Sequence, residues 1–157
     1  PGMRPRAAAL GLALLAAGPA GLAGQGTEFG VQAVAVAAEP GTITGGPVIA
    51  WRPARRVRMV AHAGLGGSSG ALAFRGEVQA QVLATPERRR GVGAYLGGGV
   101  ALAGGPEDAG RLILTAGLEG RPGATFGWTV ERGVGGGARV AAGVRWRRFP
   151  IWWGRGR

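Results

Sequence analysis

The chain is 157 residues long, the size of one domain, and it contains no cysteine, which excludes disulfide bonds and thiolate metal sites. Its 19 basic residues are all arginine and outnumber 8 acidic residues, giving a net charge of +11. These arginines are dispersed rather than clustered in a recognisable module, which argues against a nucleic-acid-binding protein. The 34 glycines, far above the usual share of about 7 %, follow no collagen-like repeat; in strands, glycine marks bends, bulges and close backbone approaches.

The N-terminal segment, residues 1–23, predicts a secretory signal peptide. Arg4 and Arg6 supply a positive start, residues 7–17 form a short apolar run, and small residues follow at the expected cleavage region. The alternative, a transmembrane helix, needs about 20 apolar residues, and this run is shorter and is broken by a Gly-Pro pair. We therefore expect an exported envelope protein whose folded domain is residues 24–157.

The next part of the chain predicts four β-strands, because apolar and polar side chains alternate with a period of two. The predicted ranges are 28–38, 42–52, 56–65 and 70–83. The last range shows the alternation most clearly, with apolar Leu72, Phe74, Val78, Ala80 and Val82 on one parity and Arg75, Glu77, Gln79 and Gln81 on the other. Proline and glycine predict turns at residues 39–41, 52–55 and 66–69.

The rest of the chain predicts four more strands, over residues 91–103, 110–119, 124–131 and 138–149. Eight strands joined by short turns predict an up-and-down antiparallel meander, and closing the meander into a barrel removes its exposed edges. Strands of about 9–11 residues span a bilayer at the usual tilt. The predicted fold is therefore all-β, a closed transmembrane β-barrel of about eight strands.

Two closed barrels fit this alternation, and they differ in which face turns outward. A soluble, lipocalin-like barrel of the periplasm holds its apolar side chains inside, around an apolar ligand, whereas a membrane barrel turns them toward lipid and keeps polar side chains in its lumen. The polar parity carries both signs of charge, as an ion-paired lumen would, so we favour the membrane barrel. The predicted lumen residues are Arg58, His62, Arg75, Glu77, Gln79, Gln81, Glu119, Glu131, Arg139 and Arg145.

Aromatic residues near the strand ends predict an interfacial girdle. If the N-terminus lies on the periplasmic side, then Phe29, Trp51 and Trp146 lie near the periplasmic rim and share the outward parity. Tyr95 lies near the same rim on the inward parity, so it does not fit the girdle.

Two segments carry a family resemblance. Residues 50–58, Ala-Trp-Arg-Pro-Ala-Arg-Arg-Val-Arg, form a strand–turn–strand crossing, and residues 90–99, Arg-Gly-Val-Gly-Ala-Tyr-Leu-Gly-Gly-Gly, look like a strand start common in outer-membrane barrels. Over residues 28–149 the chain resembles the small eight-stranded barrels of the outer-membrane protein A transmembrane-domain class and their porin-like relatives. The resemblance implies the bacterial outer membrane as the location, with outer-membrane lipids and the barrel-insertion machinery as partners. That machinery reads a terminal aromatic residue, which Phe149 approximates.

Few residues are candidates for chemistry. His62 is the only histidine, and on a polar parity such a residue is more often a hydrogen-bonded lumen residue than a catalyst. Ser68 and Ser69 follow it, so a lipid-modifying barrel enzyme with a Ser–His pair is a further alternative, although the expected His-x-Ser spacing is absent. Glu107-Asp108 predicts a solvated loop tip rather than a cation site.

The expected role is therefore structural or in surface interaction, with no catalysis, no cofactor and no metal. The arginine run 88–90 predicts a solvated turn that can meet the phosphates of anionic lipid or lipopolysaccharide if it lies at the surface.

The last two predicted strands have a register that can be written down. Pairing Glu131 with Arg139 across the glycine-rich turn 132–138 places Trp128 opposite Ala142 and keeps the arginines inside the barrel. This register predicts an ion pair between Glu131 and Arg139 in the lumen.

Overall fold

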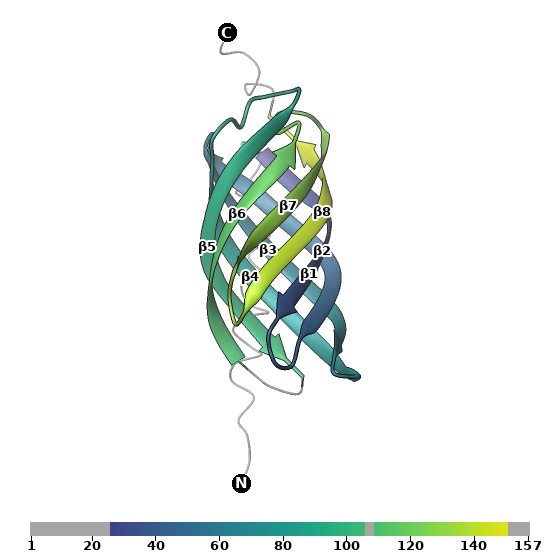
Figure 1. The fold of residues 1–157 in the computed structure, drawn as a ribbon. Coiled ribbons are helices and arrows are strands. Elements are labelled where there is room, and N and C mark those ends of the chain that lie inside the picture. Colours follow the sequence, from purple (N-terminus) through teal and green to yellow (C-terminus); the bar gives the residue numbers. More distant parts are fainter. Residues whose placement is uncertain (1–25, 106–108, 151–157) are drawn as a thin grey trace.

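The computed structural model describes residues 26–105 and 109–150, which form eight antiparallel strands closed into one barrel (Figure 1). The strands follow one another around the barrel in sequence order, and β1 pairs with β8 to complete the ring. They are β1 (Gly26–Ala37), β2 (Thr42–Ala54), β3 (Val57–Ser68), β4 (Ala71–Leu83), β5 (Val92–Gly104), β6 (Ala109–Gly120), β7 (Phe126–Val134) and β8 (Ala138–Arg148). The predicted all-β, up-and-down barrel of eight strands is confirmed.

Two predictions concern residues that the structure does not describe. The signal peptide, residues 1–23, and the Glu107-Asp108 pair lie outside the described ranges. Within those ranges, no helix is long and apolar enough to cross a membrane.

The predicted turn between the second and third strands is wrong. Residues 52–54 continue β2, and only residues 55–56 connect it to β3. Proline is tolerated in a sheet at a bulge, where no ladder hydrogen bond is lost. Pro53 lies at such a place, because the β2–β3 pairing shifts register between Trp51 and Ala54.

The two ends of the barrel differ in their connections. At the end where β1 begins and β8 ends, here called the termini end, residues 55–56, 84–91 and 121–125 join the strands. At the opposite end, here called the far end, the fully described connections are residues 38–41, 69–70 and 135–137. The predicted turn at residues 66–69 is also wrong, because β3 continues to Ser68. The two-residue turn that follows needs positive φ, which Ser69 and Gly70 adopt at 49° and 82°.

Exposed arginines gather at the termini end. Among the described residues, seven exposed arginines belong to its connections and strand ends: Arg55, Arg56, Arg88, Arg89, Arg90, Arg121 and Arg148. One of them, Arg55, pairs with exposed Glu87 across 3.2 Å. The termini end is therefore strongly basic.

Outward side chains are mostly apolar and inward side chains are mostly polar along the eight strands. Leu72 and Leu112 are 75 % and 81 % exposed on the outer face, whereas Arg58 and Gln81 are fully buried in the lumen. Some valines and Ile113 also line the interior. A soluble lipocalin-like barrel requires the reverse arrangement, so the described structure does not support that alternative.

The predicted register of the last hairpin is wrong by two residues. Glu131 faces Ala141 and Trp128 faces Val144, because β7 continues to Val134 and the turn shortens to residues 135–137. Gly136 and Gly137 have φ of 81° and 144°, a region that favours glycine, so this short turn can close. A shift of two residues preserves the side-chain period, so each residue keeps its predicted face.

The ladder between β6 and β7 is short. It pairs only Leu114–Glu119 with Thr129–Val134, whereas β5 and β6 pair along nearly their whole length, from Val92–Gly120 to Ala103–Ala109. This short ladder is called the β6–β7 seam below.

Candidate functional site

The lumen brings together charged side chains from every strand except β5, which has none. The ten side chains predicted for the lumen are all buried. Polar residues that the prediction did not include join them inside: Glu28, Gln32, Thr44, Arg52, Ser68, Tyr95, Thr115, Thr129 and Arg147. The period-two alternation contains the signal for these residues too, since each has the inward parity of its own strand.

Two carboxylates organise the termini half of the lumen. Glu28 accepts a hydrogen bond from Arg52 Nε at 2.7 Å and lies 3.4 Å from Arg58 Nη1. Glu119 accepts hydrogen bonds from Arg58 Nη1 at 2.7 Å and from Arg147 Nη2 at 2.9 Å. Because each carboxylate serves two or more guanidinium groups, this half forms one connected ion-pair network.

A second pair of carboxylates organises the far half. Glu77 accepts hydrogen bonds from Arg75 Nε at 2.6 Å and from Arg139 Nη2 at 2.6 Å. Arg139 Nη1 also donates to Glu131 Oε2 at 2.8 Å. The predicted Glu131–Arg139 ion pair therefore exists, although it is diagonal across the hairpin rather than directly opposed.

Neutral groups connect the two halves. Tyr95 OH and Gln81 Nε2 both donate to Glu131 Oε1, at 2.9 and 3.0 Å, and Arg58 Nε donates to Gln81 Oε1 at 2.9 Å. The Arg58 guanidinium also lies over the Tyr95 ring, 4.8 Å from its centroid. Gly117 makes room for this ring, since a Cβ there would overlap it.

The termini end is closed by its own connections. Arg52 Nη1 and Nη2 donate to the backbone oxygens of Pro86 and Pro122, at 3.4 and 3.3 Å. Those prolines are buried and belong to the connections 84–91 and 121–125. The two connections are also joined to each other by a hydrogen bond from Gly123 N to Arg88 O at 2.8 Å. A buried arginine thus fastens a cap over the lumen.

The predicted girdle residues lie at the termini end of the outer face. The ring of Trp146 stacks on Phe29 with centroids 5.9 Å apart, and Phe126 packs on it at 5.5 Å. Trp51 is half-buried on the same face. Phe126 belongs to this cluster although the prediction did not include it, whereas Tyr95 is in the lumen, as its parity indicates.

Solved structures provide an independent comparison. The N-terminal β-barrel domain of Pseudomonas aeruginosa OprF matches with a TM-score of 0.60 and 14 % identity, over 77 % of this chain and 97 % of that chain. Neisserial surface protein A matches with a TM-score of 0.56 and 11 % identity, over 78 % of this chain and 96 % of that chain. The de novo designed protein TMB2.3 matches with a TM-score of 0.50 and 21 % identity, over 81 % of this chain and 98 % of that chain, and a structure from the de novo design of transmembrane β-barrels matches with a TM-score of 0.52 and 14 % identity, over 80 % and 96 % of the two chains. The chain has the fold of the small transmembrane β-barrels. No protein-family model and no curated protein matches the sequence.

A β-barrel of eight strands has an interior just wide enough for side chains. The interior of this barrel holds more arginine than glutamate side chains. Six buried arginines share four buried glutamates. Arg145 makes the longest contacts, lying 3.7 Å from Glu28 and 3.9 Å from Glu131, and donates from Nη2 to Gln32 at 3.2 Å. Its Nε and Nη1 have no hydrogen-bond partner among the described residues.

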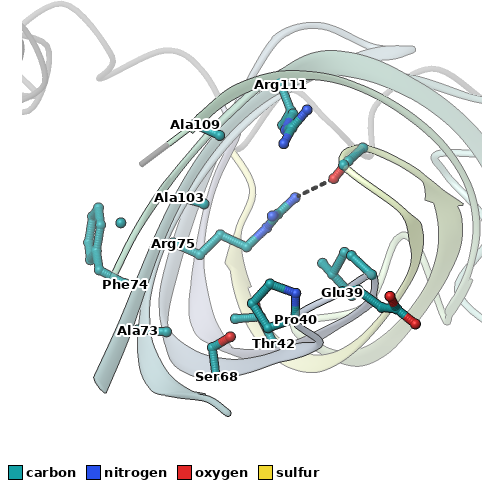
Figure 2. Close-up of a pocket in the computed structure, with 15 residues that line it drawn as sticks. Glu39, Pro40, Thr42, Ser68, Ala73, Phe74, Arg75, Ala103, Ala109 and Arg111 are labelled. Atoms are coloured by element: carbon teal, nitrogen blue, oxygen red, sulfur yellow. Dashed lines mark hydrogen bonds between the residues drawn. The ribbon is translucent and has the colours of Figure 1, made fainter. Parts of the chain in front are cut away.

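The far end of the barrel has a small mouth. Figure 2 shows Arg75 and Arg111 directed into a hollow of about 120 Å³ that Thr42 and Ser68 also line. Arg75 Nη2 donates there to the Gly135 backbone oxygen at 3.4 Å. Ligand pockets usually measure about 300–1,000 Å³, so the mouth is too small for a typical small-molecule ligand.

The residues considered for chemistry do not assemble. His62 Nε2 lies 3.2 Å from the Gln32 backbone oxygen. Ser68 is six residues further along the same strand, about 20 Å away at about 3.3 Å per residue, so the barrel-enzyme alternative lacks its Ser–His pair. The described residues contain no cluster of three or more histidine, aspartate or glutamate side chains able to hold a metal ion.

Proposed function

We propose that the chain is a β-barrel of the bacterial outer membrane with a structural or surface-interaction role, without catalysis and without a conducting pore. One observation carries the proposal: an apolar outer face with an aromatic cluster at one end encloses a lumen filled by ion-paired arginine and glutamate. Lipid is the solvent that suits such an outer face. Export would use residues 1–23 as the signal peptide, and the barrel-insertion machinery would read Phe149, the residue that follows β8.

The distribution of charge supports an orientation with the termini end in the periplasm. The connections of that end carry six exposed arginines, whereas the fully described connections of the far end carry one charged residue, Glu39, and Arg111 near the start of β6 is also exposed there. During insertion from the periplasm, the far-end connections have to cross the bilayer, and arginine crosses hydrocarbon at high cost. The basic end therefore stays on the side from which the barrel inserts.

Cell fractionation tests the proposed location. The full chain, expressed in a Gram-negative host, should be recovered in the detergent-extractable outer membrane, and its gel mobility should change on heating, as expected of a closed barrel. A matched chain without residues 1–23 should remain in the cytoplasm. Recovery of the full chain in the soluble periplasm would contradict the proposal.

The second part of the same test addresses conduction. The purified barrel in planar bilayers should show negligible conductance, because Arg52 fastens the cap and the ion-paired side chains fill the lumen. A large porin of the host serves as the positive control. Reproducible single-channel steps from the wild-type chain would refute a closed lumen.

A further inference from the structure

Arg132 is a charged residue on the otherwise apolar outer face of β7. It lies on β7 on the same parity as Val130 and Val134, and its side chain is exposed. Among the described strand residues, only Arg132 and Arg148, the last residue of β8, are charged and on the outward parity. An arginine on the lipid-facing side of a barrel is destabilising unless it reaches polar groups, so its presence needs a partner.

A hollow in the outer face begins beside Arg132. It measures about 680 Å³ and crosses strands β4 to β8. This volume is within the usual range of about 300–1,000 Å³ for ligand sites. Its walls are hydrocarbon, chiefly Leu96, Leu118 and Val130, and its floor is low because Ala94 and Ala116 have small side chains. The outer face thus contains an apolar groove over these strands.

The register shows how the groove runs. Val82, Leu96, Ala116 and Arg132 are successive partners across β4 to β7. Val82 is near the termini end of β4, whereas Arg132 is near the far end of β7. Because the strands of a barrel tilt, the groove descends from Arg132 toward the termini end as it crosses the sheet. Arg132 therefore lies at the end of the groove closer to the far interface, Arg56 lines the groove near the termini end, and the outward side chains between them are apolar.

We propose that this groove binds one phosphate-bearing lipid of the far leaflet, with an acyl chain in the hollow and a headgroup phosphate paired with Arg132. Guanidinium recognises phosphate through paired, charge-assisted hydrogen bonds, and a long arginine side chain can extend along apolar surface to reach the headgroup level. The inference rests on the proposed function, under which the far leaflet is the outer leaflet of the outer membrane. The lipid is then the lipid A part of lipopolysaccharide.

Native mass spectrometry of the full chain, released from detergent with added lipid A, tests the proposal. Wild type should retain one lipid A molecule. Arg132→Leu should weaken retention at least tenfold, and Arg132→Lys should restore part of it. Ala116→Phe should also weaken retention, because it fills the floor of the groove while leaving Arg132 in place. Arg148→Leu, which removes an outward arginine at the end of β8, is the matched control and should behave as wild type.

Each alternative has a distinct result. Unchanged retention in Arg132→Leu would overturn the proposal, and so would equal retention of phosphatidylglycerol, which lacks a phosphate monoester. A lipid-free dimer that Arg132→Leu dissociates would show that a second copy of the chain occupies the groove instead. All variants are first checked for heat-modifiable migration. A folded barrel that fails to retain lipid A refutes this inference alone, whereas recovery of the chain in the soluble periplasm refutes the proposed function.

Discussion

Each glutamate of the lumen holds more than one partner, so removing a single carboxylate leaves several groups uncompensated. Glu131→Ala removes one of the acceptors of Arg139, one of the acceptors of Gln81, and the acceptor of the Tyr95 hydroxyl. Breaking a buried ion pair on one side costs about 3–5 kcal/mol, and we expect a loss of that size in the free energy of unfolding, measured with urea in detergent micelles. The double variant Glu131→Ala/Arg139→Met should be less harmful than Glu131→Ala alone.

The exposed Arg55–Glu87 pair provides the control for this comparison of the Glu131 and Arg139 variants. Both side chains are about half exposed, and an exposed pair is worth no more than about 1 kcal/mol, so Glu87→Ala should have a small effect. Additive effects of the Glu131 and Arg139 substitutions would mean that their contact contributes nothing to stability.

The alternation of polar and apolar residues was sufficient to assign the ten predicted side chains to the inner face of the barrel. It did not predict which of these side chains contact one another. Arg58 on β3 reaches Glu119 on β6, a contact across the barrel between residues far apart in sequence. Long flexible side chains choose among several acceptors in a closed space, and strand parity carries no information about that choice. Arg52 was assigned to a turn because Pro53 follows it, so its part in the cap was not predicted.

At the scale of a strand, the two faces should respond differently to charge. Leu114 is 66 % exposed on the outer face of β6, whereas its neighbour Thr115 is buried and donates a hydrogen bond to Gln79. Arginine facing lipid near the bilayer midplane costs about 2–4 kcal/mol, so Leu114→Arg should lower the free energy of unfolding by about that amount. Thr115→Arg should cost less, because the Gln79 and Gln81 side chains and other polar groups of the lumen surround it. Equal losses at the two positions would indicate burial on both faces.

The existence and faces of the strands followed from the sequence, whereas their ends and register did not. Proline at 53 and glycines at 66 and 67 are turn signals, yet each lies within a strand. Pairing on both sides outweighs local preference in a closed sheet. The last hairpin shows the same limit, since a shift of two residues leaves every face unchanged and parity cannot detect it.

At the scale of the whole molecule, the closed lumen depends on segments that sequence patterns treat separately. The backbone oxygens of Pro86 and Pro122 come from different connections, and one arginine on β2 joins them. Backbone oxygens have no residue-type signature, so no motif could indicate the cap. The filled interior, by contrast, follows from strand number alone.

The β6–β7 seam has a consequence for how long the barrel survives. A ring has no free edge from which to fray, so unfolding must begin by parting one ladder, and the shortest ladder parts at least cost. In a chain without cysteine, Leu118→Cys/Val130→Cys joins facing residues across the seam, and Val100→Cys/Leu112→Cys does the same across the longer β5–β6 ladder. Directly facing residues suit disulfide geometry.

We expect the seam cross-link to raise the temperature at which the folded gel band converts to the unfolded band by more than the β5–β6 cross-link does. If both cross-links raise this conversion temperature equally, unfolding does not begin at the β6–β7 seam. If the seam cross-link has the larger effect, the rate of unfolding, and with it the lifetime of the barrel in the membrane, is limited by the residues from Leu114 to Glu119.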